Sequence, residues 1–324
     1  MIFLMENNQP LVSIVVVSYQ QVDFLKECIE SILLQTYKNI EIIIADDGST
    51  DRSPELIRSF AAANSNIIPI LSPVNKGISI NLNLGMEQCR GQYICIIAGD
   101  DIMYPSKIEK QVAFLNENAE FELCYHNVDV YDEDTKTILY KWMDKFLPCR
   151  NAPDALFRAA WNLKKNNRKT PSGSWFGRAS YLKYARNDWR TYSSHEFIFT
   201  MGMYAAKPDA KWHTLTEVLG MYRTHSKGLS KNNGKWQKTA EEMSVCYSLA
   251  RVKFPQFTRA INNEEAFWWF MELLYNQVPG EYRGIYLKEF LRKYGLGRYL
   301  YLQTCRVLLS DKLKAVRKLV KEPA

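Results

Sequence analysis

The stretch IEIIIADDGSTD, residues 40–51, decides the fold class of this chain. Its first half is rich in β-branched residues and predicts a strand that is buried on both faces. Its second half holds the acidic, glycine and hydroxyl residues that are typical of a turn. Pro54 suits the first turn of a helix, with Asp51 or Ser53 as the cap. The stretch therefore predicts a strand, an acidic turn and a helix in succession.

The same order of strand and helix recurs on both sides of this stretch. Such alternation implies βαβ crossovers, so we expect an α/β fold with a mostly parallel, Rossmann-like sheet flanked by helices. Weaker strand patterns follow at 172–177 and 217–224, and the pattern after residue 234 is helical. The other expected strands cover residues 11–18, 67–71, 92–97 and 121–131, and the other expected helices cover 22–35, 77–90 and a segment opened by Pro105.

Composition limits the class of protein. The chain has 324 residues, of which 47% are hydrophobic and 24% charged, so collagenous and wholly disordered classes are excluded. Its seven cysteines show no C-x-x-C spacing, which fits reduced thiols better than a disulfide framework or a zinc site. We expect neither a secretory signal at residues 1–10 nor a membrane span, and therefore a cytoplasmic location.

The net charge of +7 belongs to the C-terminal region, because residues 281–324 hold eleven Lys or Arg against four Asp or Glu. Aromatic residues recur there every four positions, and residues 310–324 form a basic amphipathic pattern that suits an anionic membrane surface at the inner face of the cytoplasmic membrane. The alternative is a helical subdomain that packs its apolar face on the rest of the protein. No recognition motif accompanies the charge, so nucleic acid is not an expected partner.

Two acidic clusters, at 46–47 and 100–101, each follow an expected strand. Carboxyl ends of parallel strands meet at one edge of a sheet, where ligands bind. Carboxylates there can hold a divalent metal on a nucleotide diphosphate, or bind ribose hydroxyls. The alternative is that each cluster is only a turn with a helix cap. The presence of two such clusters in one sheet favours a binding site.

Several ordered segments resemble the family 2 glycosyltransferases, which have the A-type nucleotide-diphosphosugar fold. The resemblance is dense over residues 10–131 and looser to about residue 230. It implies a catalytic domain at 1–230, with a nucleotide-binding half at 10–131 and an acceptor half at 132–230, and a basic helical region at 231–324. The segments are LVSIVVVSYQ (11–20), IIIADDGSTD (42–51), NKGIS (75–79), RGQYI (90–94) and GDD (99–101).

The resemblance implies roles for residues of the donor site. Asp47 is expected to read the uracil or an equivalent base, and the backbone at Val17 to face that base. Asp100 matches the acid that contacts the ribose, and Asp101 matches the ligand of a Mn²⁺ or Mg²⁺ ion on the diphosphate. An acid often found two residues before Asp100 is replaced here by Ala98.

A positive charge of the family pattern is also missing. An Arg that is often found in the helix after the third strand is replaced by Leu82, and we expect Lys76 to supply that charge. The segment GMYRTH (220–225) resembles the end of the family's catalytic domain, so His225 is expected to close over the diphosphate or metal, with Arg223 nearby. The alternative for His225 is a structural role, and His126 and His213 have only that interpretation.

The family's inverting members need a general base beside the acceptor hydroxyl. Glu196, in the segment SHEF (194–197), stands at the matching place, and a carboxylate is ionised at neutral pH. The alternative is that Glu196 lies in the first turn of a helix, where the helix dipole favours an acid. Trp175 and Trp189 can stack on a sugar face, although core packing is the ordinary role of such residues.

The resulting hypothesis is an inverting, metal-dependent glycosyltransferase that moves one sugar from a UDP-hexose to a glycan. By resemblance, the acceptor is a polyprenyl-diphosphate-linked sugar in surface polysaccharide assembly, of the O-antigen, lipopolysaccharide or capsule type. One alternative is an enzyme that transfers a sugar to a protein or a teichoic-type acceptor. The other is a catalytically silent relative that binds nucleotide-sugar or partner proteins. A nicotinamide dehydrogenase is disfavoured, because no G-x-G-x-x-G follows the first expected strand.

Overall fold

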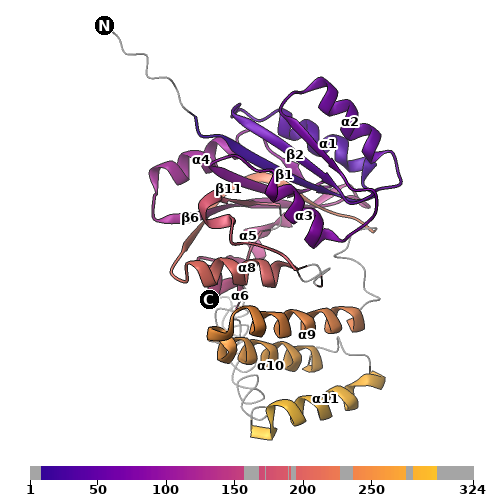
Figure 1. Cartoon of the computed structure of the whole chain (residues 1–324), viewed down its shortest axis with the longest axis vertical. Helices are drawn as coiled ribbons and strands as arrows, with labels where there is room; N and C mark the ends of the chain where they lie inside the picture. The colour runs from indigo at the N-terminus through magenta and orange to yellow at the C-terminus, as the bar shows by residue number, and fades with distance from the viewer. Residues whose placement is uncertain are drawn as a thin grey trace, which may run out of the picture. The chain divides into compact units, whose positions relative to one another are not determined.

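The computed structural model describes residues 9–156, 168–171, 173–188, 190, 195–226, 236–274 and 280–297. They form two compact units, the first within residues 1–155 and 167–234 and the second within 156–166 and 235–324 (Figure 1). In the part of the chain that the structure describes, no helix is both long enough and apolar enough to cross a membrane.

The first unit begins with the predicted alternation of strands and helices and continues with shorter elements. The alternating elements are β1 (Val12–Ser18), α1 (Val22–Leu33), β2 (Ile40–Asp46), α2 (Ser53–Ala63), β3 (Ile67–Leu71), α3 (Ile78–Glu87), β4 (Tyr93–Ala98), β5 (Ile102–Met103), α4 (Lys107–Glu117) and β6 (Phe121–Asp132). The later elements are β7 (Thr137–Lys141), α5 (Trp142–Lys145), β8 (Leu147–Pro148), α6 (Ala152–Leu156), β9 (Arg168–Lys169), β10 (Trp175–Arg178), α7 (Ala179–Leu182), α8 (His195–Ala206) and β11 (Lys211–Thr224).

One sheet organises this unit. Its described strands follow the order β3-β2-β1-β4-β10-β6-β11-β5, with β7 paired to β6, while β8 and β9 form a separate two-stranded sheet. The first four are parallel, as the alternation predicts, and β11 is parallel to β6. Three of these strands pair antiparallel: β10 between β4 and β6, β5 with β11, and β7 with β6. The sheet is therefore mostly parallel, and the weaker strand patterns at 172–177 and 217–224 do mark strands.

Helices cover both faces of the parallel half. Alternate residues of β1, such as Ile14 and Val16, are fully buried in one cluster with apolar residues of α1, α2 and α4. The opposite face is covered by α3, whose Asn81 donates a hydrogen bond to the Ala45 carbonyl at 2.7 Å. Each fully buried Ile contributes roughly 1.5–3 kcal/mol to folding. Burial on both faces explains why these strands read as continuous β-branched runs.

The second unit consists of helices α9 (Trp236–Lys253), α10 (Thr258–Leu274) and α11 (Gly280–Tyr294), with a 3₁₀ turn at Pro255–Phe257. Glu265 of α10 is 1% exposed and pairs with Arg251 of α9 at 2.7 Å and with Lys293 of α11 at 2.6 Å. Two cations thus neutralise one buried carboxylate and tie three helices together.

The predicted aromatic row of the C-terminal region lies partly in this second unit. Phe290 is buried and packs against Phe270, with ring centroids 6.4 Å apart, and against Tyr294 at 5.0 Å. These aromatic residues therefore contribute to a core within the second unit. Packing of this region on the rest of the protein stays a prediction. The basic amphipathic segment at 310–324 lies outside the described residues.

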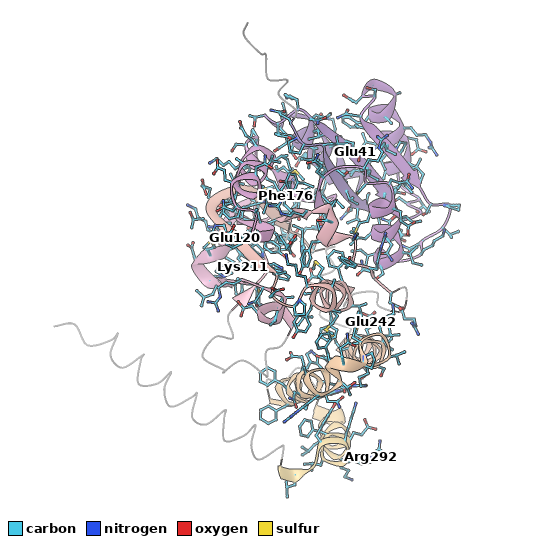
Figure 2. All side chains as sticks on the ribbon, turned by 60° about the vertical axis from the view of Figure 1, so that its left-hand side comes forward. Glu41, Glu120, Phe176, Lys211, Glu242 and Arg292 are labelled. Atoms are coloured by element: carbon cyan, nitrogen blue, oxygen red, sulfur yellow. The ribbon has the colours of Figure 1, made fainter. Side chains whose placement is uncertain are left out.

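Glu41 of β2 is a buried carboxylate in the sheet (Figure 2). It accepts hydrogen bonds from Ser13 Oγ at 2.6 Å, from the Arg90 backbone amide at 2.7 Å and from Arg90 Nε at 2.9 Å. Burial by itself raises the pKa of Glu41, but these hydrogen bonds outweigh it, so the pKa lies below its ordinary value.

This lowered pKa gives a pH-dependent contribution to stability. A depressed carboxyl pKa stabilises the fold above the unfolded-state pKa, and the stabilisation is lost as pH falls through the folded-state pKa. We expect Glu41→Gln to lower the free energy of unfolding at neutral pH by about 1–3 kcal/mol, because its amide opposes the Arg90 donors. In urea unfolding series, the difference from wild type should shrink toward acid pH. The exposed Glu120→Gln is the control; a difference for Glu41→Gln that is independent of pH would contradict the expectation.

Candidate active site

Several residues predicted for the donor site meet where β1, β2 and β4 end. Ser18 lies opposite Asp46 in the register of β1 and β2. The Asp47 amide donates to the Ser18 carbonyl at 2.9 Å, and the Gly99 amide donates to the Val17 carbonyl at 2.8 Å. The two acidic clusters are thus attached to the same strand end, which is the ligand-binding edge of such sheets.

The turn after β2 is held against the segment at 75–77. Asp47 is buried and accepts hydrogen bonds from the backbone amides of Lys76 and Gly77, both at 2.8 Å. Gly48 has a φ of +69°, and a Cβ on it would lie 2.4 Å from the Val74 carbonyl carbon, so glycine is required there. Asp47 therefore shapes the loop directly, and its contact with a base stays a prediction.

Asp51 joins the starts of two helices. Its carboxylate accepts hydrogen bonds from the Val22 amide at 3.1 Å and from the Ser53 amide at 2.9 Å. Burial raises its pKa, but the hydrogen bonds outweigh burial and lower it. The expected cap of α2 was wrong, because Arg52 occupies the capping position and makes no side-chain cap bond. Asp51 instead fixes α1 to the turn beside the site.

Asp101 faces the protein interior. It is 2% exposed, and its Oδ1 accepts a hydrogen bond from the Arg223 backbone amide at 2.9 Å. Gly173 packs against its other oxygen: a Cβ on this glycine would lie 2.8 Å from Asp101 Oδ2. Burial and the neighbouring Asp100 raise the pKa of Asp101, and the Arg223 amide and the Lys107 ammonium oppose that rise. These contacts tie Asp101 into the fold, and its role as a metal ligand stays a prediction.

Asp100 and His225 come together instead. The Asp100 side chain is 17% exposed, and its Oδ2 lies 3.1 Å from His225 Nε2, whose side chain is 9% exposed. The sequence paired His225 with Asp101 as metal ligands, whereas the structure brings His225 to Asp100. A carboxylate oxygen and an imidazole nitrogen are both ligands that manganese accepts.

The spacing of this pair fits a divalent ion. The distance of 3.1 Å is that of a hydrogen bond between His225 Nε2 and Asp100 Oδ2. It is also close to the separation of about 3 Å between neighbouring ligand atoms of an octahedral ion with ligands at about 2.1 Å. His225 Nδ1 is buried and has no hydrogen-bond partner among the described residues. No group of three or more His, Cys, Asp or Glu suited to a metal occurs in the described part of the chain.

Two polar atoms at this edge were not singled out from the sequence. Ser18 Oγ and Gln21 Oε1 are buried and have no hydrogen-bond partner within the described residues. A Cβ on Gly99 would lie 2.9 Å from Gln21 Oε1, so Gln21 reaches the end of β4. Buried polar atoms are rarely left unpaired, so these are candidate ligand contacts. The sequence signal that could have found them is the polar character of the residues at the end of the first strand and directly after it.

Glu196 lies in the first turn of α8, as the structural alternative predicts, and its side chain is exposed. Glu196 also acts electrostatically on the buried Tyr125. The pKa of Tyr125 is raised mainly by burial, and the charges of Cys149, Tyr181 and Glu196 add to the rise. An exposed carboxylate at a helix start is open to a hydroxyl ligand. Its role as the general base stays a prediction.

The remaining aromatic and histidine candidates have structural surroundings. Trp175 is buried, with its ring 5.1 Å from Tyr125, 5.3 Å from Phe199 and 6.3 Å from Trp212. Trp189 lies outside the described residues. His126 is fully buried with Nδ1 2.7 Å from the Asn127 carbonyl, and His213 stacks on Phe114 at 4.3 Å. Leu82 is buried in α3, while Lys76 is exposed beside the turn.

The chain matches known glycosyltransferases in sequence. The profile of the family described as Glycosyl transferase family 2 matches residues 13–211. A putative glycosyltransferase of Bacillus subtilis, EpsE, is 38% identical over 128 residues, which are 39% of this chain and 46% of the relative. An uncharacterised glycosyltransferase of Haemophilus influenzae is 38% identical over 111 residues, 34% of this chain and 44% of the relative. The matches span less than half the length of these two curated relatives.

Solved structures show the same fold at low identity. S. aureus TarS 1–349 in complex with UDP has a TM-score of 0.62 at 14% identity, over 92% of this chain and 87% of that chain. The mannosyltransferase PcManGT of Pyrobaculum calidifontis, in complex with GDP-Man and Mn²⁺, has a TM-score of 0.54 at 13% identity, over 93% of this chain and 80% of that chain. These likenesses establish the A-type glycosyltransferase fold.

The two neighbouring acids should differ in their effect on stability. We expect Asp101→Ala to lower the free energy of unfolding by about 1–3 kcal/mol, because the buried Arg223 amide loses its acceptor. Asp100→Ala, at the more exposed position, should change it by less than about 0.5 kcal/mol. Urea unfolding without added metal measures both. A larger loss of unfolding free energy for Asp100→Ala than for Asp101→Ala would contradict the expectation that Asp101 is the carboxylate that stabilises the fold.

Proposed function

Because the chain belongs to glycosyl transferase family 2, we propose that it transfers a single sugar from a UDP-hexose to a glycan acceptor. The observation that carries this proposal is the pair of Asp100 and His225, 3.1 Å apart at the ligand-binding edge of the sheet. Structures of the same fold that hold UDP, UDP-GlcNAc, or GDP-Man with Mn²⁺ support a nucleotide-sugar donor.

In the proposed donor site, Asp100 and His225 would hold Mn²⁺ or Mg²⁺ on the diphosphate. We propose Asp100 as the metal ligand in place of Asp101, because Asp101 accepts a hydrogen bond from the Arg223 amide and packs against Gly173. The carbonyl side of Val17 and the carboxylate of Asp47 flank the base. The exposed Lys76 supplies a positive charge for the diphosphate from the segment that Asp47 holds.

The proposed reaction is a single displacement. Glu196 accepts the proton of the acceptor hydroxyl, the hydroxyl oxygen forms a bond to the anomeric carbon, and the electron pair of the breaking bond goes to the diphosphate oxygen. Attack from the face opposite the diphosphate inverts the anomeric centre. The metal, when bound, stabilises negative charge on the diphosphate. A positioned base of this kind typically contributes about 10²–10⁴-fold in rate.

We further propose that the acceptor is a lipid-linked glycan of surface polysaccharide assembly at the inner face of the cytoplasmic membrane. The basic character of residues 281–324 supports this setting, because cationic segments are attracted to anionic lipid surfaces.

Calorimetric titration with UDP, GDP and TDP, each with and without Mn²⁺, tests the donor site. We expect UDP to bind, and to bind more tightly with Mn²⁺. Asp100→Asn should remove the gain from Mn²⁺ while metal-free UDP binding persists, because an amide is a weaker metal ligand than a carboxylate. Asp209→Asn, an exposed acid after α8, is the matched control. Absence of binding by the folded protein for all three nucleotides would instead support the silent relative.

Glu196→Gln tests the proposed base. Donor binding should be unchanged, because Glu196 acts on the acceptor, and turnover should fall by about 100-fold or more. The measurement is UDP release from the donor with a bacterial lipid extract as the acceptor source. The exposed Glu120→Gln should retain full turnover. Near-normal turnover of Glu196→Gln would place the base elsewhere.

A further inference from the structure

Arg223 touches both members of the acidic pair. Its side chain is 4% exposed, and its Nε donates to the Asp100 carbonyl at 2.9 Å. Its backbone amide donates to Asp101 Oδ1, also at 2.9 Å. One residue at the end of β11 therefore fixes the main chain of Asp100 and the side chain of Asp101. His225, two residues later, is placed from the same strand end.

The rest of the guanidinium joins two other segments to this point. Nη1 donates to Glu133, directly after β6, and Nη2 donates to Glu27 of α1. The Glu133 amide in turn donates to the Thr224 carbonyl at 2.8 Å. Arg223 thus uses three nitrogens in three directions, which the planar fork of arginine allows and the single ammonium of lysine does not.

Phe24 of α1 links Arg223 to His225. The Arg223 guanidinium lies 4.9 Å from the centre of the Phe24 ring, within the range of a cation–π contact. The same ring lies 4.8 Å from the His225 imidazole. The imidazole therefore rests against a ring that Arg223 holds in place, and the Asp100 main chain is held by the same guanidinium.

We propose that Arg223 is a positioning residue that keeps Asp100 and His225 at the spacing of neighbouring metal ligands. This inference rests on the proposed function. Two adjacent carboxylates repel each other, and the buried guanidinium of Arg223 acts on the Asp101 carboxylate and donates to the main-chain carbonyl of Asp100. Residues that orient metal ligands without binding the metal themselves typically change metal affinity by about 10–100-fold when they are substituted. Arg223 has that position, and it contacts the ligand pair through the Asp100 main chain and through Phe24.

The test compares Arg223→Lys with Arg178→Lys. Arg178 is half-buried and donates to the carbonyls of Phe121 and Leu115, near the opposite ends of the strands. Both substitutions keep the positive charge and remove the planar guanidinium group with its several nitrogen donors. Mn²⁺ affinity is measured in the presence of saturating UDP, from the electron paramagnetic resonance of free Mn²⁺, and metal-free UDP affinity by calorimetry. Thermal unfolding is followed in parallel.

We expect Arg223→Lys to weaken Mn²⁺ binding by about 10-fold or more, with unchanged metal-free UDP affinity. Arg178→Lys should lower the unfolding temperature without changing Mn²⁺ affinity. Equal Mn²⁺ affinity in Arg223→Lys and wild type, or an equal loss in both variants, would overturn the inference. If Arg223→Lys does not fold, Glu27→Gln replaces it, since Glu27 is exposed; a weakening of Mn²⁺ binding supports the inference and no change overturns it. Wild-type protein that binds neither UDP nor Mn²⁺ would refute the proposed function itself.

Discussion

Two carboxylates in succession at the end of one buried strand repel each other, and the candidate site is organised around the way this repulsion is relieved. Asp101 turns inward, toward the Arg223 amide and the buried Lys107, while Asp100 turns toward His225. Lys107 is held in turn by the Gly173 carbonyl at 3.0 Å. Segments far apart in the sequence are thereby brought to one edge: the end of β4, the start of α4, the turn at Gly173 before β10 and the end of β11.

The parallel half of the fold could be predicted from the sequence because burial on both faces imposes a simple pattern. Runs such as residues 40–45 contain little except β-branched residues, and acidic or glycine-rich turns separate them from helical periods. The antiparallel strand β10 was only a weak pattern, since it has four residues and contains a glycine. Its place between β4 and β6 depends on pairing partners about 50 to 80 residues away, which no local pattern encodes.

The site was predictable to the level of the sheet edge but not of individual side chains. Adjacent residues such as Asp100 and Asp101 have the same local signal, and only the later segments that contain Gly173 and Arg223 decide which one faces inward. The role of Arg223 was equally hidden, because its partners Glu27 and Glu133 lie 196 and 90 residues away in the sequence. The family resemblance predicted which residue types stand at the matching positions, but it did not predict which way their side chains point.

The position of β10 also limits how this protein can be divided. The parallel strands β3, β2, β1 and β4 end at β4, whose outer side is paired with Trp175–Arg178 of β10. A fragment cut after β6 would leave the backbone groups on this side of β4 without their strand partner, and such an edge is a template for association with other chains. The parallel strands and the later strands of the first unit therefore share one continuous sheet, so a fragment that keeps the edge of β4 covered would need to include β10.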